Sequence, residues 1–111
     1  IGPPELPLLR RINVGVGNAI HCVVLEFIDD SRRGLCVNQF NEPLDLTDEN
    51  IELRGGDWIT IERGDYILYV SGYNLNQGNF LCHSINLTFK SGNILCFESR
   101  NKDWKGEMFP I

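Results

Sequence analysis

The chain of 111 residues contains 42% apolar and 23% charged residues, and its formal net charge is −5. This composition is typical of a folded domain and excludes a disordered chain. No apolar run approaches the roughly 18 residues of a membrane-spanning helix, so no membrane span is expected. Acidic residues outnumber basic ones by 15 to 10, which argues against a nucleic-acid-binding surface.

The predicted elements are almost all β-strands within a single domain, residues 1–111. Residues 1–8 contain three prolines and are expected to form an extended lead-in. No window has apolar residues at helical spacing, so no helix is expected. Residues 41–50 are an acidic surface connection, and residues 99–111 are a tail without an assigned strand. Alternating or β-branched runs between turn residues predict strands at 12–16, 23–28, 35–40, 58–62, 66–70, 80–89 and 94–97, with turns at 29–34, 63–65, 74–79 and 90–93.

The run Ser84–Lys90 (SINLTFK) has the clearest two-residue alternation. Ile85, Leu87 and Phe89 share one face and are predicted to point into the core. Asn86 then points outward. Because Asn86-Leu87-Thr88 is an N-glycosylation sequon, Asn86 is a possible glycosylation site in a secretory setting.

The first two of the four cysteines are not expected to form a disulfide within their hairpin. If residues 29–34 close that hairpin, Cys36 lies opposite about Phe27 rather than opposite Cys22. The even number of cysteines nevertheless leaves pairing between sheets open.

A disulfide between the other two cysteines, within their own hairpin, is not expected either. A hairpin closed by residues 90–93 places Cys96 opposite about Leu87 rather than opposite Cys82. Each of the four cysteines lies in an apolar run, where a free thiol packs as a small hydrophobic side chain. The prediction is therefore four reduced, buried cysteines.

Metal binding and catalysis have little support in the sequence. His21-Cys22 and Cys82-His83 resemble halves of a zinc site, but adjacent strand residues point to opposite faces and no C-x-x-C spacing is present. No serine lies in a G-x-S-x-G elbow, and no glycine-rich phosphate loop precedes a helix. The chain is expected to be non-catalytic and to need no metal or cofactor.

The C-terminal half resembles the jacalin-like lectin family. The motifs are DYILYVSGY at Asp65–Tyr73, SINLTFK at Ser84–Lys90, and the run Ile94–Phe97 after a turn. In that family a Y-x-x-x-V-S-G-Y strand end is followed by an S-L-T-F-K strand and a glycine-bearing turn. The order and spacing of these pieces agree with the family pattern.

The upstream part is similar to the same family. Leu9–Val14 (LRRINV) looks like its strand of the I-R-x-I-x-V type, Val23–Phe27 like the next strand, and Trp58–Ile61 precedes the tyrosine motif at the right distance. The resemblance covers roughly residues 9–97. It implies a β-prism, in which three antiparallel Greek-key sheets surround a pseudo-threefold axis.

The resemblance also implies binding of mannose- or galactose-type carbohydrate without metal. The family's main sugar loop has the pattern G-x-x-x-D, and no glycine of this chain has an aspartate four positions later. The glycine-rich start and the closing strands are missing as well, so the prism is expected to be incomplete at the C-terminus. The candidate sugar-binding residues are therefore those of one loop: Tyr73, Asn74, Asn76 and Gln77.

Two functions follow from the resemblance. In the first, the chain is a carbohydrate-binding, lectin-type domain of a larger protein. In the second, it is an interaction or scaffold module that has lost sugar binding and is completed by a partner chain. Both require a protein partner or further residues to complete the fold, because unpaired strand edges recruit other strands.

Overall fold

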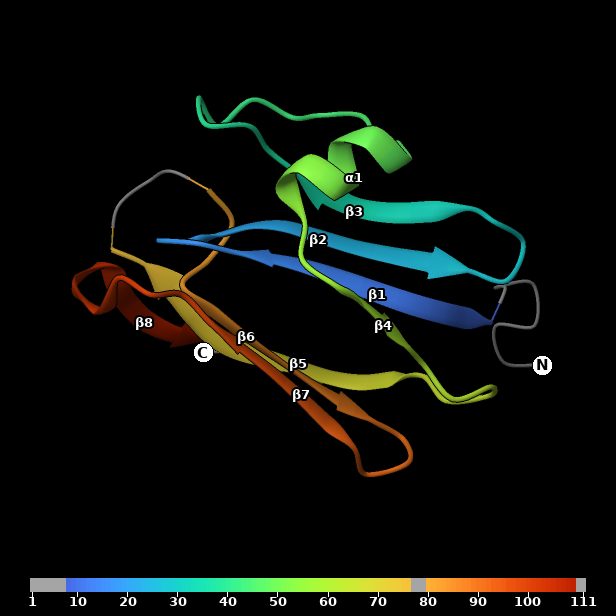
Figure 1. Cartoon of the computed structure of the whole chain (residues 1–111). Coiled ribbons are helices and arrows are strands. Elements are labelled where there is room, and N and C mark those ends of the chain that lie inside the picture. Colours follow the sequence, from blue (N-terminus) through green and yellow to red (C-terminus); the bar gives the residue numbers. More distant parts are fainter. Residues whose placement is uncertain (1–7, 77–79, 110–111) are drawn as a thin grey trace.

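The computed structural model describes residues 8–76 and 80–109 and contains two four-stranded antiparallel sheets (Figure 1). The first sheet has the order β3-β2-β1-β4 and the second the order β7-β6-β5-β8. The all-β class is thereby confirmed, with one short helix added. The strands of the first sheet are β1 (Leu9–Val16), β2 (Ile20–Phe27), β3 (Arg32–Cys36) and β4 (Trp58–Thr60). Those of the second sheet are β5 (Ile67–Leu75), β6 (Ser84–Phe89), β7 (Ile94–Glu98) and β8 (Lys105–Phe109).

The inner faces of the two sheets enclose the larger apolar core. Ile12 and Val14 of β1 are buried there together with Leu87 and Phe89 of β6, and Ile85 packs against them. The predicted orientation of the SINLTFK strand is therefore confirmed. Since a directly opposed residue lies on the same face, each ladder partner of these residues also points inward.

The two sheets are joined by backbone hydrogen bonds at one end. The Ile20 amide donates to the Cys82 carbonyl at 2.9 Å, and the Leu81 amide donates to the Ile20 carbonyl at 3.0 Å. A third bond runs from the Arg100 amide to the Gly17 carbonyl at 2.9 Å. From this joined end the sheets diverge (Figure 1).

A helix that the sequence did not predict covers the outer face of the first sheet. In α1 (Asp48–Arg54) the Thr47 side chain accepts a hydrogen bond from the Asn50 amide at 3.2 Å, which caps the N-terminus. Only Ile51 of the helix is buried, and it packs on a second apolar cluster that contains Cys22, Val24 and Cys36. The prediction of no helix was wrong because a seven-residue helix with one buried side chain produces no apolar period.

The predicted register of the first hairpin was also wrong. Cys36 lies directly opposite Cys22, and Arg32 lies opposite Glu26. The reason is that part of the polar segment 29–34, treated as turn throughout, joins strand β3. The structure shows Cys22 and Cys36 as free thiols.

The second hairpin differs from the prediction by one residue. Cys96 lies opposite Asn86, and Leu95 lies opposite Leu87. A shift of one residue moves a side chain to the other face of a sheet. Cys96 is consequently exposed, not buried as predicted, whereas Cys82 is buried as expected. Asn86 lies on the outer face, half-buried.

Several strand ends differ from the predicted ranges. β5 continues to Leu75, through the start of the predicted turn, and β6 begins at Ser84 rather than at Phe80. The unassigned tail contains a 3₁₀ helix, η1 (Lys102–Trp104), followed by β8. β8 pairs with β5, so this tail supplies one of the two edge strands of the second sheet.

Candidate functional site

Tyr73 lies in β5 on the outer face of the second sheet. Its directly opposed residues are Ser84 on one side and Met108 on the other. The ammonium group of Lys105 lies 4.0 Å from the centroid of the Tyr73 ring, a cation–π contact. One face of the ring is therefore already occupied by a side chain of the same sheet, and only the other face could stack on a sugar.

The neighbouring predicted residues are not assembled around Tyr73 into one pocket. The Asn76 side chain donates to the Asp103 carbonyl at 2.7 Å, and its main-chain amide donates to the Trp104 carbonyl at 3.0 Å. Asn76 thus holds η1 in place. Asn74 is exposed, and Gln77 lies outside the described residues.

A cleft of about 330 Å³ lies close to this loop, at the end where the sheets are joined. It combines two aromatic rings with two amides and a guanidinium group, the groups that stack on a sugar ring and bond to its hydroxyls. Five separate segments bring these residues together, so sequence reasoning missed them. The lining residues are Gly17, Asn18, Ala19, His21, Gln39, Arg54, Phe80 and Trp104.

The walls of this cleft are held by hydrogen bonds to backbone groups. Both ring nitrogens of His21 face carbonyls: Nε2 lies 2.6 Å from the Arg54 oxygen and Nδ1 lies 3.3 Å from the Ala19 oxygen. The Arg54 Nε donates to the Val37 carbonyl at 3.1 Å. His21 therefore fixes the end of α1 against the β1–β2 turn.

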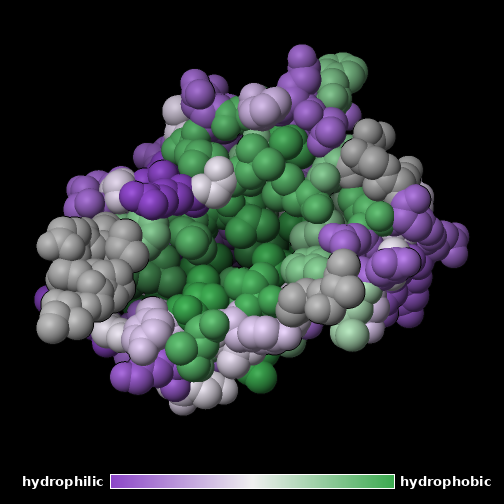
Figure 2. All heavy atoms as spheres, turned by 180° about the vertical axis from the view of Figure 1, so that it is seen from behind, coloured by the Kyte–Doolittle hydropathy of each residue, from purple (hydrophilic) through white to green (hydrophobic). Residues whose placement is uncertain are grey.

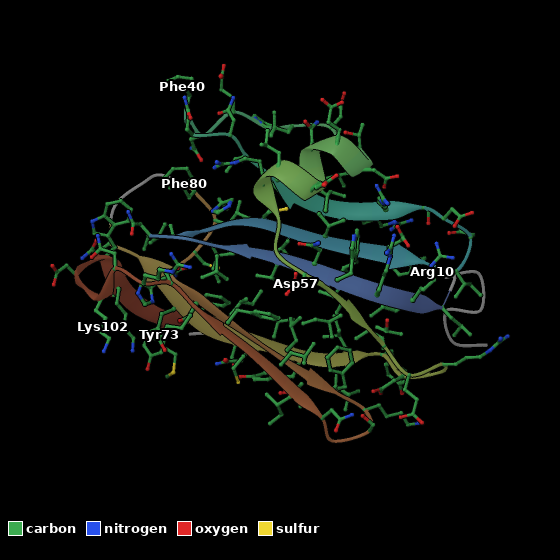
Figure 3. All side chains as sticks on the ribbon, viewed as in Figure 1. Arg10, Phe40, Asp57, Tyr73, Phe80 and Lys102 are labelled. Atoms are coloured by element: carbon green, nitrogen blue, oxygen red, sulfur yellow. The ribbon has the colours of Figure 1, made fainter. Side chains whose placement is uncertain are left out.

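Two residues near the cleft have a left-handed backbone conformation. Asn41 has φ of 63° and Phe80 has φ of 68°. The Phe80 amide donates to the Asn41 side-chain oxygen at 2.8 Å, so the two unusual conformations support each other. Figure 3 shows Phe40, Phe80, Tyr73 and Lys102 at this same end of the molecule, whereas Arg10 lies at the other. Such conformations cost energy and often occur at binding sites.

A second feature is an apolar, wedge-shaped groove between the diverging sheets, which we call the wedge. Figure 2 shows hydrophobic side chains gathered in a hollow on one side of the molecule. Leu35 lies opposite Val23, and Val70 lies opposite Leu87, so both belong to the inner faces. Yet Leu35 is 42% exposed and Val70 is 39% exposed. The core between the sheets is therefore open to solvent on this side.

A charged cluster surrounds Glu26 on the outer face of the first sheet. Nitrogens of Arg10, Arg11 and Arg32 lie 2.7 to 3.1 Å from its carboxylate oxygens. The hydrogen bond from Arg11, followed by those from Arg32 and Arg10, overcomes the effect of burial and lowers the pKa of Glu26 to about 2. The Arg11 guanidinium also stacks 3.9 Å from the centroid of the Trp58 ring.

This cluster is balanced in charge. Arg10 also pairs with Asp30, and Arg32 also pairs with Asp48, so the three cations face three carboxylates. We therefore assign the cluster a structural role, because no net charge remains to attract an ion.

The residues considered as zinc ligands pack in apolar clusters or make hydrogen bonds instead. Cys22 and Cys82 lie in different apolar clusters. His83 is buried, and its Nε2 lies 3.1 Å from the Asn101 carbonyl, whereas its Nδ1 has no hydrogen-bond partner in the part of the chain that the structure describes. Within residues 8–76 and 80–109, no group of three or more histidine, cysteine, aspartate or glutamate residues is placed to hold a metal ion.

Comparisons with known proteins identify no family. No family model matches the sequence, and no curated protein matches it significantly. Among the described residues, no helix has the length and apolar character needed to cross a bilayer.

Proposed function

We propose that this chain is a non-catalytic, jacalin-like recognition domain that binds carbohydrate once a third sheet covers its open side. The observation that carries the proposal is the apolar wedge between two four-stranded antiparallel sheets. In this proposal, the two sheets that diverge from one joined end would be two sides of a β-prism. The third side is the one on which the core is open.

The apolar lining of the wedge and the strand edges beside it indicate what kind of element would cover it. Apolar side chains exposed together in a groove are unfavourable in water and are typical of an interface. Within the described residues, β3 and β8 are edge strands of the two sheets and each pairs with a strand on one side only, although the Leu44 amide donates to the Cys36 carbonyl at the end of β3 at 2.7 Å. Unpaired edges accept further strands. The covering element is therefore antiparallel β-structure with one apolar face, supplied by another polypeptide segment.

Sugar binding by residues 1–111 alone is expected to be weak. Sugars are strongly hydrated, so tight binding needs several preorganised hydrogen bonds that offset desolvation. Lys105 covers one face of Tyr73, and the Asn76 amide is bound to backbone. The cleft beside Phe80 and Trp104 offers further stacking and amide groups, but the G-x-x-x-D loop of the family is missing from the sequence.

A titration tests the sugar-binding part. Mannose, galactose and glucose are added to the chain, and amide shifts are followed by NMR. The dissociation constants are expected to be no tighter than about 1 mM, or roughly −4 kcal/mol. Saturable binding tighter than this, abolished by Tyr73→Ala, would show that the predicted loop is already a complete site and that no third sheet is needed.

A matched pair of variants tests the wedge. Val70 and Ile94 are both exposed β-branched residues of the second sheet, but Val70 points into the wedge and Ile94 lies on the outer face. A dye that fluoresces in apolar grooves is expected to bind the wild type and Ile94→Glu equally, and Val70→Glu several-fold less. Equal binding to both variants would show that the wedge is not the accessible apolar surface.

The scaffold function is the second candidate, and the same wedge favours it. The two functions predict different responses to sugar once the wedge of the domain is covered. If the chain with its wedge covered still gives no sugar-dependent shifts, the wedge serves assembly alone.

A further inference from the structure

Two of the four cysteines form a matched pair within the first sheet. Cys22 lies in β2 and Cys36 ends the edge strand β3, and the two are directly opposed in the antiparallel ladder. Both belong to the apolar cluster beneath α1, and neither is exposed to solvent. Directly opposed side chains point to the same face, so the two thiols face the same cluster.

The hydrogen-bond pattern shows what kind of pair this is. The Val37 amide donates to the His21 carbonyl at 2.9 Å, so His21 and Val37 are the hydrogen-bonded pair next to the cysteines. Hydrogen-bonded and non-hydrogen-bonded pairs alternate along an antiparallel ladder. Cys22 and Cys36 therefore form a non-hydrogen-bonded pair, whose Cα atoms are typically about 4.5 Å apart, within the range of about 4.4 to 6.8 Å found for disulfides.

We propose that Cys22 and Cys36 form a cross-strand disulfide under oxidising conditions, which ties the edge strand β3 to β2, while Cys82 and Cys96 remain thiols. The other two cysteines have no such partner. Cys82 belongs to the core between the sheets, and Cys96 lies on the outer face of the second sheet opposite Asn86.

The reaction is an exchange with a small-molecule disulfide such as oxidised glutathione. The thiolate of one cysteine attacks a sulfur of glutathione disulfide, which breaks its S–S bond and releases one glutathione thiolate. The second cysteine then attacks the sulfur of the first, forms the protein disulfide and releases the second glutathione thiolate. The protein loses two electrons and two protons, and both are accounted for in the two glutathione thiols.

The folded structure controls when this reaction can occur. Burial, followed by the hydrogen bond with Cys36, raises the pKa of the Cys22 thiol to about 12, which keeps it protonated and unreactive. Exchange therefore requires that β3 detach from β2, or that it take place before folding is complete. β3 is an edge strand of five residues, so its detachment leaves the rest of the sheet paired.

Mass spectrometry tests the proposal directly, because trypsin places each cysteine in a different peptide. Cys22 falls in residues 12–32, Cys36 in 34–54, Cys82 in 64–90 and Cys96 in 91–100. The protein is refolded with oxidised and reduced glutathione, and free thiols are then alkylated in denaturant. The expected result is two alkylated cysteines and one disulfide-linked pair of peptides, 12–32 with 34–54.

Two variants complete the experiment. Cys82→Ser with Cys96→Ser is expected to keep the linked pair, and Cys36→Ser is expected to lose it. The linked pair is measured in the wild type, so the proposal remains testable even if Cys36→Ser folds poorly. Four alkylated cysteines after refolding in oxidising buffer, or a bridge to Cys82 or Cys96 in place of the proposed one, would overturn it.

Discussion

Replacement of Glu26 by glutamine tests whether the arginine cluster stabilises the fold. The Glu26 side chain is 4% exposed and accepts bonds from three arginines. The hydrogen bonds from Arg11, Arg32 and Arg10 lower its pKa from 4.5 to about 2, which corresponds to roughly 3 kcal/mol of stability at neutral pH. Because the arginines are partly exposed and screened by solvent, we expect Glu26→Gln to reduce the free energy of unfolding by about 2 kcal/mol.

The lowered pKa of Glu26 also predicts how the stability difference between wild type and Glu26→Gln changes with pH. A carboxyl with a lowered pKa stabilises the folded state above its unfolded pKa and loses that contribution as the pH falls through the folded pKa. The difference between wild type and Glu26→Gln should therefore be constant above about pH 5 and shrink as the pH falls from 4.5 toward 2.

Urea unfolding at pH 7 and at several values between 2 and 5 measures this difference. Asp30→Asn is the matched control, because Asp30 pairs with Arg10 but its side chain is 84% exposed, so its loss should cost less than about 1 kcal/mol. The reasoning is refuted if Glu26→Gln costs no more than Asp30→Asn, or if its cost does not change with pH.

Two further substitutions test the core and the first hairpin. Phe89 is buried in the core between the sheets, so Phe89→Ala should lower the free energy of unfolding by about 3–5 kcal/mol. Ile94→Ala on the outer face is the control and should cost far less. A loss under about 1 kcal/mol for Phe89→Ala would contradict its placement in the core. Gly34 has φ of 138°, and an added Cβ would lie 2.0 Å from the Val23 carbonyl oxygen. In urea unfolding, Gly34→Ala should therefore be clearly more destabilising than Gly64→Ala, because Gly64 has φ of 89° but its added Cβ would meet no described atom within 4 Å. Equal costs would mean that β3 does not approach β2 as closely as described.

Among the described strands, β1 to β7 could be located approximately from the sequence because alternation is a local property, whereas β8 was not predicted. Ile85, Leu87 and Phe89 point inward as the two-residue period predicts. Register is different, since it depends on where the turn ends. Residues 29–34 are polar throughout, yet Arg32 joins β3 because its guanidinium bonds to Glu26 across the ladder. Polar composition alone could not separate this residue from the turn.

The candidate site was less predictable because distant segments form it. The loop-end cleft brings Asn18, Gln39, Arg54 and Trp104 together from four parts of the chain, and each is unremarkable in its own segment. The motif-based residues Tyr73 and Asn76 do not line this cleft; Lys105 and Asp103 of the unassigned tail contact them instead. The contacts of a segment without a predicted strand could not be anticipated.

The two faces of the second sheet are suited to different uses. Its inner face lines the wedge, where Val70 is available to a covering strand, and its outer face carries the sequon at Asn86. Asn86 lies between Ser71 and Cys96 on that outer face, so a glycan attached there would extend away from the wedge. Modification of Asn86 and covering of the wedge are therefore compatible, because they would involve opposite faces of the same sheet.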